Sequence, residues 1–182
     1  MKFGIVDVIK AKIRGTFNIN QLVKDGLKIG NNVNIMGECI IDPGHCWLIE
    51  IGDNVTLAPR VHVLAHDAST KKFLGYTRIA KVKIGNNVFV GAGSIILPSV
   101  TIGDNVIIGA GSVVTKNCNT NGIYVGNPAK KIADFDEYIE KHKNNICSGE
   151  YPVFDESYKI GDITDIMKDE MKCKLSYLGY IK

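Results

Sequence analysis

Long apolar runs are absent from this 182-residue sequence, which has no stretch of the roughly 18 hydrophobic residues that a membrane-spanning helix requires. The N-terminal residues 1–14 mix charged side chains into the apolar ones: Lys2, Asp7, Lys10, Lys12 and Arg14. Such charges interrupt the apolar core that a secretory signal peptide needs. We therefore expect a chain with no membrane span that stays in the cytoplasm.

Cysteine is scarce, and its five positions show no CxxC spacing: Cys39, Cys46, Cys118, Cys147 and Cys173. Disulfide frameworks use an even number of cysteines, and cysteine zinc sites use closely spaced pairs. The pattern argues against both and favours reduced thiols.

Aromatic residues are also few, and no segment alternates them with basic residues as a nucleic-acid-binding groove does. We therefore expect no nucleic-acid partner. Positive charge is unevenly distributed, because residues 1–131 carry 15 Lys and Arg against 8 Asp and Glu, whereas residues 132–182 carry 7 against 11. The basic part suits a phosphorylated cofactor, and ordinary solubilising charge is the alternative interpretation.

An internal repeat of six residues is the strongest signal present. Counted from Ile84, the chain reads IGNNVF, VGAGSI, ILPSVT, IGDNVI, IGAGSV and VTKNCN. The first residue of every unit is Ile or Val, and the fifth is Val or Ser in five of the six. The same period occurs earlier, where Ile29 begins IGNNVN and Ile51 begins IGDNVT.

A period of six does not suit an α-helix, in which positions six apart lie about 240° from each other around the axis. It suits a short strand followed by a tight turn, with the first residue pointing inward and Gly, Asn or Asp in the turn. Three units then close one triangular coil, and stacked coils pair as parallel strands about 4.8 Å apart. Each coil buries its aliphatic side chains only against its neighbours, as in other solenoids.

Two interruptions break this period. The segment between Ile41 and Ile51 leaves the coil around Asp42–Trp47, and residues 67–81 (DASTKKFLGYTRIAK) form a longer excursion loop. Insertions into solenoids often lie on the binding face, although a tolerated surface loop has the same sequence signature. The position of the excursion loop directly after His66 favours a functional role.

We divide the chain into three parts: an N-terminal cap segment (1–26), a β-helix domain (27–131) that carries the excursion loop, and a C-terminal helical tail (132–182). We expect a short helix near Val6–Ile13 in the cap. In the tail we expect a helix over Asp134–Lys143, irregular structure over 144–160, and a second helix from Asp162 or Thr164 to about Lys174. The tail shows no recognisable chemistry.

The repeats over about residues 27–119 resemble the hexapeptide-repeat acyltransferase family. The galactoside, maltose and nodulation-factor O-acetyltransferases are similar, and the capsular or surface-polysaccharide O-acetyltransferases are more similar still. The resemblance implies an all-β fold, a left-handed parallel β-helix, whose handedness opposes the usual right-handed crossover rule. It also implies acetyl-CoA-dependent transfer of an acetyl group to a hydroxyl of a sugar or surface glycan, in polysaccharide biosynthesis, by a homotrimer with active sites between subunits.

His66 is the expected general base. It lies in VLAHDAS, at the end of a repeat and directly before the excursion loop, and the catalytic His of the family occupies that position. An imidazole can accept a hydroxyl proton near neutral pH, and a well-placed base contributes about 10²–10⁴-fold in rate. Without the resemblance, a single His on a coil corner would more often be structural.

Acetyl-CoA is the expected co-substrate, and in this family it lies in a groove between subunits. The segments that match its contacts are VGAGSI, IGAGSVVTK and GNPAKKI. The resemblance assigns these residues to the cofactor: Ala92 and Ala110 to the pantetheine, and Thr115, Lys116, Lys130 and Lys131 nearer the nucleotide phosphates. Small residues also fit the turns of a coil, which is the alternative explanation for the glycines. Phe89 departs from relatives that carry Trp there, but it keeps an aromatic wall.

The expected mechanism is direct transfer without a metal or a covalent enzyme intermediate, with a backbone N–H such as that of Ala92 stabilising the oxyanion. The irregular turn at the first interruption supplies the expected acceptor-binding residues Asp42, His45 and Trp47, because carboxylate and indole groups commonly bind sugars. A purely structural corner is the alternative for these three residues.

Other functions are compatible with a hexapeptide β-helix. Within the acyltransferases they are a sugar-nucleotide N-acetyltransferase and a serine acetyltransferase. From other classes they are a non-catalytic scaffold and a γ-type carbonic anhydrase, a zinc enzyme that would use His45, His62 and His66 as ligands. The carbonic anhydrase interpretation leaves GNPAKK and the excursion loop unexplained.

Overall fold

The structure is a computed structural model that describes residues 18–182, so the helix predicted near Val6–Ile13 lies outside the described residues. The chain forms two compact units, one ending at Phe135 and one comprising Asp136–Lys182. None of the helices within residues 18–182 is both long and apolar enough to cross a lipid bilayer.

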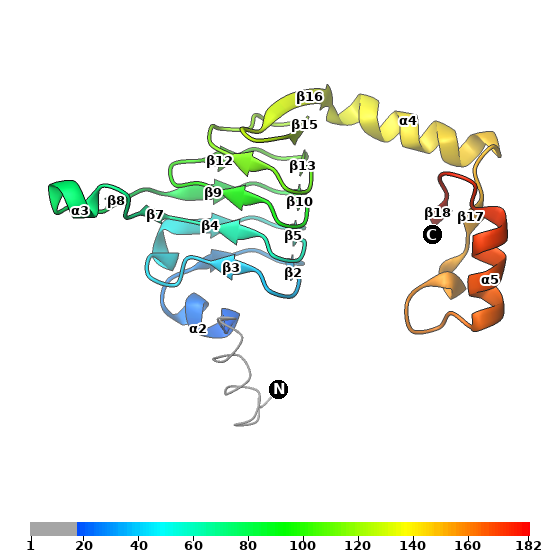
Figure 1. The fold of residues 1–182 in the computed structure, drawn as a ribbon, viewed down its shortest axis with the longest axis horizontal. Coiled ribbons are helices and arrows are strands. Elements are labelled where there is room, and N and C mark those ends of the chain that lie inside the picture. The colour runs from blue at the N-terminus through cyan, green and yellow to red at the C-terminus, as the bar shows by residue number, and fades with distance from the viewer. Residues whose placement is uncertain (1–17) are drawn as a thin grey trace, which may run out of the picture. The chain divides into compact units, whose positions relative to one another are not determined.

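The first unit is a triangular stack of short parallel strands, visible edge-on in Figure 1. Face 1 contains β1 (Lys28–Ile29), β4 (Ile49–Ile51), β9 (Val82–Ile84) and β12 (Thr101–Ile102). Face 2 contains β2 (Asn34–Ile35), β5 (Thr56–Leu57), β10 (Phe89–Val90), β13 (Val106–Ile108) and β15 (Gly122–Val125). Face 3 contains β3 (Ile40–Ile41), β6 (His62–Val63), β11 (Ile95–Ile96) and β14 (Val113–Val114). Each coil passes through the three faces in turn, so the prediction of triangular coils is confirmed.

The interior of the stack follows the six-residue period. The first residue of each unit is fully buried: Ile84, Val90, Ile96, Ile102, Ile108 and Val114. The fifth residue is also buried: Val88, Ser94, Val100, Val106, Ser112 and Cys118. Equivalent residues pair between coils, as Ile51 with Ile84 does on face 1. The core is therefore a column of aliphatic layers in which each coil covers the next.

Asparagines hold the turns between face 1 and face 2. Five of them adopt left-handed backbone conformations with φ between 52° and 58°: Asn32, Asn54, Asn87, Asn105 and Asn121. Asn tolerates this region better than other non-glycine residues. Their side-chain amides form a continuous ladder from coil to coil, with hydrogen bonds of 2.9–3.2 Å.

The lower end of the stack is closed by the short helix α2 (Ile19–Lys24), whose Leu22 is buried in the core. The first interruption of the repeat forms a 3₁₀ turn, η1 (Cys46–Leu48), between β3 and β4. Cys46 is fully buried, and its thiol lies 3.5 Å from the carbonyl oxygen of Leu22. The interruption is thus a packed part of the lower coils.

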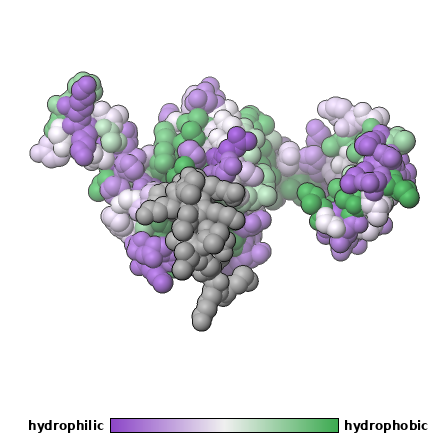
Figure 2. Space-filling view, turned by 60° about the horizontal axis from the view of Figure 1, so that its bottom comes forward, coloured by the Kyte–Doolittle hydropathy of each residue, from purple (hydrophilic) through white to green (hydrophobic). Residues whose placement is uncertain are grey.

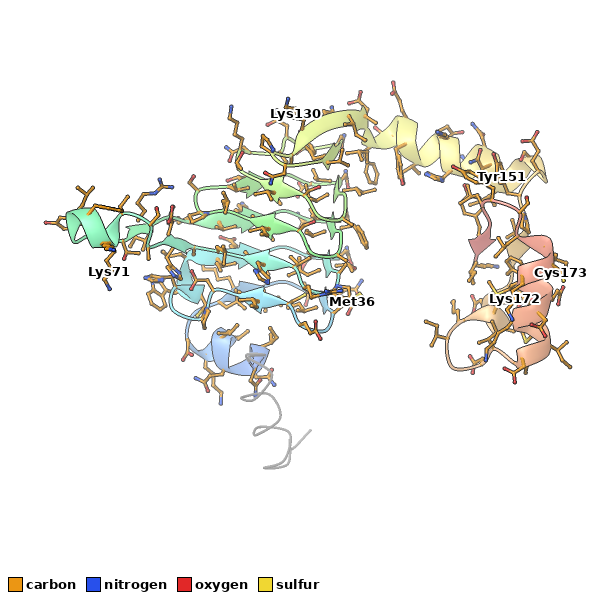
Figure 3. All side chains as sticks on the ribbon, viewed as in Figure 1. Met36, Lys71, Lys130, Tyr151, Lys172 and Cys173 are labelled. Carbon is orange, nitrogen blue, oxygen red and sulfur yellow. The ribbon has the colours of Figure 1, made fainter. Side chains whose placement is uncertain are left out.

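The excursion segment is an antiparallel hairpin of β7 (His66–Asp67) and β8 (Arg78–Ile79) with the short helix α3 (Lys71–Leu74) between them. It projects from the stack in Figure 1 and carries Lys71 in Figure 3. Hydrophilic and hydrophobic residues lie side by side on it in Figure 2, and Phe73 and Tyr76 are largely exposed. A hairpin stem was not anticipated from the sequence.

The segment GNPAKK closes the upper end of the stack, where β15 turns back into β16 (Lys130–Asp134) as an antiparallel hairpin. The Ala129 N–H donates to the Val113 carbonyl oxygen at 2.9 Å, so this turn lies over the last strand of face 3. Lys130 is labelled on the hairpin in Figure 3.

The second unit contains α4 (Phe135–Ser148), β17 (Val153–Phe154), η2 (Glu156–Tyr158), α5 (Asp165–Lys174) and β18 (Tyr180–Ile181). Helix α4 continues past Lys143 into the region predicted to be irregular, and the Thr164 side chain caps α5. The Tyr180 hydroxyl hydrogen-bonds His142 and Asn145 of α4, which ties the end of the unit to its beginning.

Candidate active site

The centre of the candidate site is a hydrogen-bonded pair formed by Asp42 and His66. Asp42 follows β3 and His66 ends the coil directly above it, because β3 and β6 pair with Ile41 opposite Val63. The Asp42 Oδ2 atom lies 2.5 Å from His66 Nδ1 and accepts a further hydrogen bond from the Ala65 N–H at 3.0 Å. The coil register therefore sets the position of both side chains.

The surroundings of Asp42 favour its ionised form. Burial alone would raise the pKa of this carboxyl. The hydrogen bond from His66, the Ala65 N–H, the charge of His66 and the Gly44 N–H outweigh burial and hold the pKa of Asp42 below its ordinary value. A carboxylate has no proton to donate, so His66 donates to it through Nδ1, and in the neutral imidazole the Nε2 atom carries the free lone pair.

A second imidazole faces the other oxygen of the same carboxylate. His45 Nδ1 lies 3.9 Å from Asp42 Oδ1, and the His45 and His66 ring centroids are 4.9 Å apart. The ring of Trp47 lies 5.4 Å from that of His45, measured between centroids, and Trp47 is 54% exposed. The irregular turn thus places an imidazole beside His66 and an indole beside that imidazole.

The Asp42 carboxylate has no exposed surface, whereas the His66 side chain is 38% exposed. Asp42 was expected to contact the acceptor, but the structure places it beneath His66, where it orients the ring. This pairing was not predicted from the sequence. It could have been found by stacking the repeats, because Asp42 directly follows the last buried position of one coil and His66 ends the next.

The residues assigned to the cofactor lie in three places: two different edges of the stack and the terminal hairpin. Ala92 and Ala110 lie on the edge between faces 2 and 3, where the Gly111 N–H bonds the Ala92 carbonyl oxygen. Thr115 and Lys116 directly follow β14, on the edge between face 3 and face 1. His66 lies on this same edge, so the width of face 3 separates it from Ala92. Lys130 and Lys131 lie on the terminal hairpin β15–β16. One protomer therefore does not bring these residues together.

The glycines beside Ala92 and Ala110 are explained by the coil itself. A Cβ atom on Gly91 would collide with the backbone of Ala110 in the next coil. Gly93 and Gly111 have φ of 69° and 68°, a conformation that favours glycine. These glycines are therefore no indication of a ligand, because the turns of the coil require them.

The histidine triad of the carbonic anhydrase interpretation is not assembled. Among the described residues, the cluster of metal-ligating side chains with atoms within 4.8 Å of one another comprises Asp42, His45 and His66 and does not include His62. His62 lies on β6 between Ile40 and Ile95 of the neighbouring coils.

Comparison with known proteins agrees with this architecture. The family described as bacterial transferase hexapeptide (six repeats) matches residues 81–116. Protein CapG of Staphylococcus aureus is 43% identical over 131 residues, which cover 69% of this chain and 76% of that protein.

Two solved structures are also similar. A maltose O-acetyltransferase from Clostridium difficile 630 has 44% identity and a TM-score of 0.53 over 60% of this chain and 59% of its own. A galactoside acetyltransferase in complex with coenzyme A has 31% identity and a TM-score of 0.52 over 63% and 58%. The chain thus spans less than two thirds of each of these structures. Together with the repeats and the stacked coils, these matches show that the chain belongs to the bacterial hexapeptide-repeat transferase family, whose fold is the left-handed parallel β-helix.

Proposed function

We propose that this protein is an acetyl-CoA-dependent O-acetyltransferase that acetylates a hydroxyl of a sugar or surface glycan, with His66 as the general base. The observation that carries the proposal is the buried Asp42 carboxylate at 2.5 Å from His66 Nδ1, on a partly exposed imidazole. This arrangement fixes the tautomer and leaves Nε2 available to a substrate. The names of the two solved relatives, each of which specifies a sugar and an acetyltransferase, support the substrate class.

The chemical steps follow from this pair. His66 Nε2 takes the proton of the acceptor hydroxyl while the oxygen attacks the thioester carbonyl carbon. The carbon–sulfur bond then breaks, and His66 returns the proton to the departing thiolate, which gives the acetyl ester and the coenzyme A thiol. Asp42 stabilises the imidazolium that exists between these two transfers, as the aspartate of a Ser-His-Asp triad does.

The donor would lie between two protomers. Ala92 and His66 are separated by the width of face 3, which is roughly 15–20 Å of extended chain. Reacting groups must approach to about 3–3.5 Å, so the Ala92 N–H of the same protomer is too far from His66 to serve as oxyanion donor. In a cyclic homotrimer, the Ala92 edge of one copy can lie against the His66 edge of the next. This arrangement brings the donor-binding residues of one protomer to the base of its neighbour.

The acceptor would enter beside His45 and Trp47. The exposed indole offers an apolar face for a sugar ring, and His45 adds a polar edge between Trp47 and His66. Lys116 and Lys130 are both exposed and suit the phosphates of coenzyme A.

A turnover screen tests the proposal. Purified chain is incubated with acetyl-CoA and sugars, oligosaccharides, amino sugars or serine, and release of the coenzyme A thiol is followed. We expect turnover with a hydroxyl acceptor of the sugar class and saturable binding of coenzyme A. Turnover confined to amino sugars or to serine would favour the N-acetyltransferase or serine acetyltransferase alternative. Absence of coenzyme A binding in every oligomeric form would overturn the proposal and favour a scaffold.

A further inference from the structure

We propose that Asp42, His45 and His66 also form a binding site for a divalent transition-metal ion, with Zn²⁺ the ion that fits these ligands. The site goes beyond the proposed acetyl transfer, and its existence does not depend on that activity. Histidine nitrogen and carboxylate oxygen are the donors that zinc commonly uses. The three side chains offer ligand atoms within 4.8 Å of one another.

An unpartnered nitrogen points to a missing ligand. Within residues 18–182, nothing hydrogen-bonds His45 Nδ1, although this atom is buried. Most buried polar atoms in native proteins have a partner. The nearest acidic atom is Asp42 Oδ1, at 3.9 Å, which is too long for a hydrogen bond.

The spacing of these two atoms suits a metal ion better than a hydrogen bond. Zinc binds nitrogen and oxygen at about 2.0–2.2 Å, so two tetrahedral ligand atoms lie about 3.4 Å apart. A small side-chain rotation would bring His45 Nδ1 and Asp42 Oδ1 from 3.9 Å to that separation. Asp42 Oδ1 accepts a hydrogen bond from the Gly44 N–H at 3.1 Å, which leaves one of its lone pairs for an ion.

Access and charge are also suitable. His45 Nδ1 and the Asp42 carboxylate are buried, but the His66 and His45 side chains are 38% and 27% exposed, so an ion can enter beside these two rings and keep a water as a further ligand. One carboxylate and two neutral imidazoles provide a single negative charge, which a divalent cation neutralises.

Binding of an ion excludes the arrangement needed for base catalysis. Asp42 Oδ2 and His66 Nδ1 are 2.5 Å apart, closer than two ligand atoms on one zinc ion can lie. His66 must therefore give up its hydrogen bond to Asp42 when it joins the ion. The proposed acetyl transfer would be inhibited by zinc and restored by a chelator.

The test compares zinc binding by His45→Ala and His62→Ala. His62 is a matched control because it is a half-buried histidine of the same coil stack that lies outside the cluster. All proteins carry Cys147→Ser and Cys173→Ser, since these exposed thiols could bind zinc themselves. The chelator-treated full chain is titrated with Zn²⁺ by calorimetry, without substrates, and folding is checked by circular dichroism. His45→Gln provides a second variant if His45→Ala unfolds.

We expect one zinc ion per protomer in the parent and in His62→Ala. In His45→Ala we expect the affinity for zinc to be at least about 100-fold weaker. Loss of a residue that only hydrogen-bonds a metal ligand already lowers metal affinity by about 10–100-fold, and His45 would be a ligand itself. Equal affinity in the parent and His45→Ala, absence of binding in the parent, or loss of binding in His62→Ala would each overturn the site. Zinc binding that depends on His45, in a protein without transferase activity, would uphold the site and refute the proposed function alone.

Discussion

At Asp42, one buried carboxylate receives three hydrogen bonds, from His66, the Ala65 N–H and the Gly44 N–H. It lies under the imidazole rather than at the surface, so its effect on catalysis would be exerted through the orientation and charge of His66. The family resemblance selected His66 as the expected base, because the catalytic His of that family lies directly before the excursion segment. The partner could not be selected in that way, because the pairing depends on which residues of successive coils lie above one another.

Asp42→Asn tests this positioning role. The amide keeps the shape of the side chain but removes the charge that stabilises the imidazolium, so we expect kcat to fall by about 10²–10⁴-fold. Binding of coenzyme A should not change. Asp67→Asn is the control, since Asp67 lies beside His66 in sequence but pairs with Arg78 at 3.4 Å. A similar loss in both variants, or unchanged kcat in Asp42→Asn, would argue against the assignment.

The cysteines give a second test at this scale. Burial raises the pKa of the Cys118 thiol to about 11. At pH 8 only about one thousandth of it is thiolate, and thiolate is the reactive form. Cys147 and Cys173 are exposed. We expect Ellman's reagent to modify these two rapidly in the native protein, and Cys118 and Cys46 only after unfolding. Rapid modification of Cys118 in the folded chain would contradict the buried fifth position of the last repeat.

At the scale of elements, the period of six was sufficient to predict the strands, the inward residues and the turns. The stem of the excursion segment was not predictable, since β7 and β8 have two residues each and their pairing depends on where the coil releases and recaptures the chain. The terminal hairpin was not predicted from the sequence, because GNPAKK carries no periodic signal.

Asn105 tests the contribution of the asparagine ladder. Its amide donates to Asn121 at 2.9 Å and accepts from Asn87 at 3.0 Å, and its φ is 52°. We expect Asn105→Ala to lower the free energy of unfolding by about 2–4 kcal/mol, from two lost hydrogen bonds and a left-handed backbone. Asn105→Gly loses the same bonds without the backbone cost, so it should be about 1–2 kcal/mol more stable than Asn105→Ala. Equal denaturant midpoints for the two variants would contradict this explanation.

At the scale of the whole molecule, a single protomer carries two incomplete halves of the proposed site, on the edges at either side of face 3. No pattern within one chain shows how copies associate, because the outward residues of a coil obey no strict period. The homotrimer therefore remains a prediction, and the separation of Ala92 from His66 is the structural reason for it.

Complementation tests this assembly. His66→Ala removes the base, and Ala92→Trp should block the donor groove on the other edge. If each site combines the His66 edge of one protomer with the Ala92 edge of its neighbour, a site is intact only when both contributing protomers carry the unmutated residue. In randomly mixed trimers each condition holds with a probability of about one half, so about one site in four is intact. We expect co-expressed protein to recover roughly a quarter of parental turnover. Verified mixed trimers without recovery would indicate that both halves come from one protomer.

The most direct measurement for the central claim is turnover by His66→Ala beside the parent protein, at saturating acetyl-CoA and with coenzyme A affinity determined in parallel. We expect kcat to fall by about 10²–10⁴-fold with little change in that affinity, because the imidazole acts on the acceptor proton and not on the cofactor. A variant that turns over at nearly the parental rate would show that another group removes the proton.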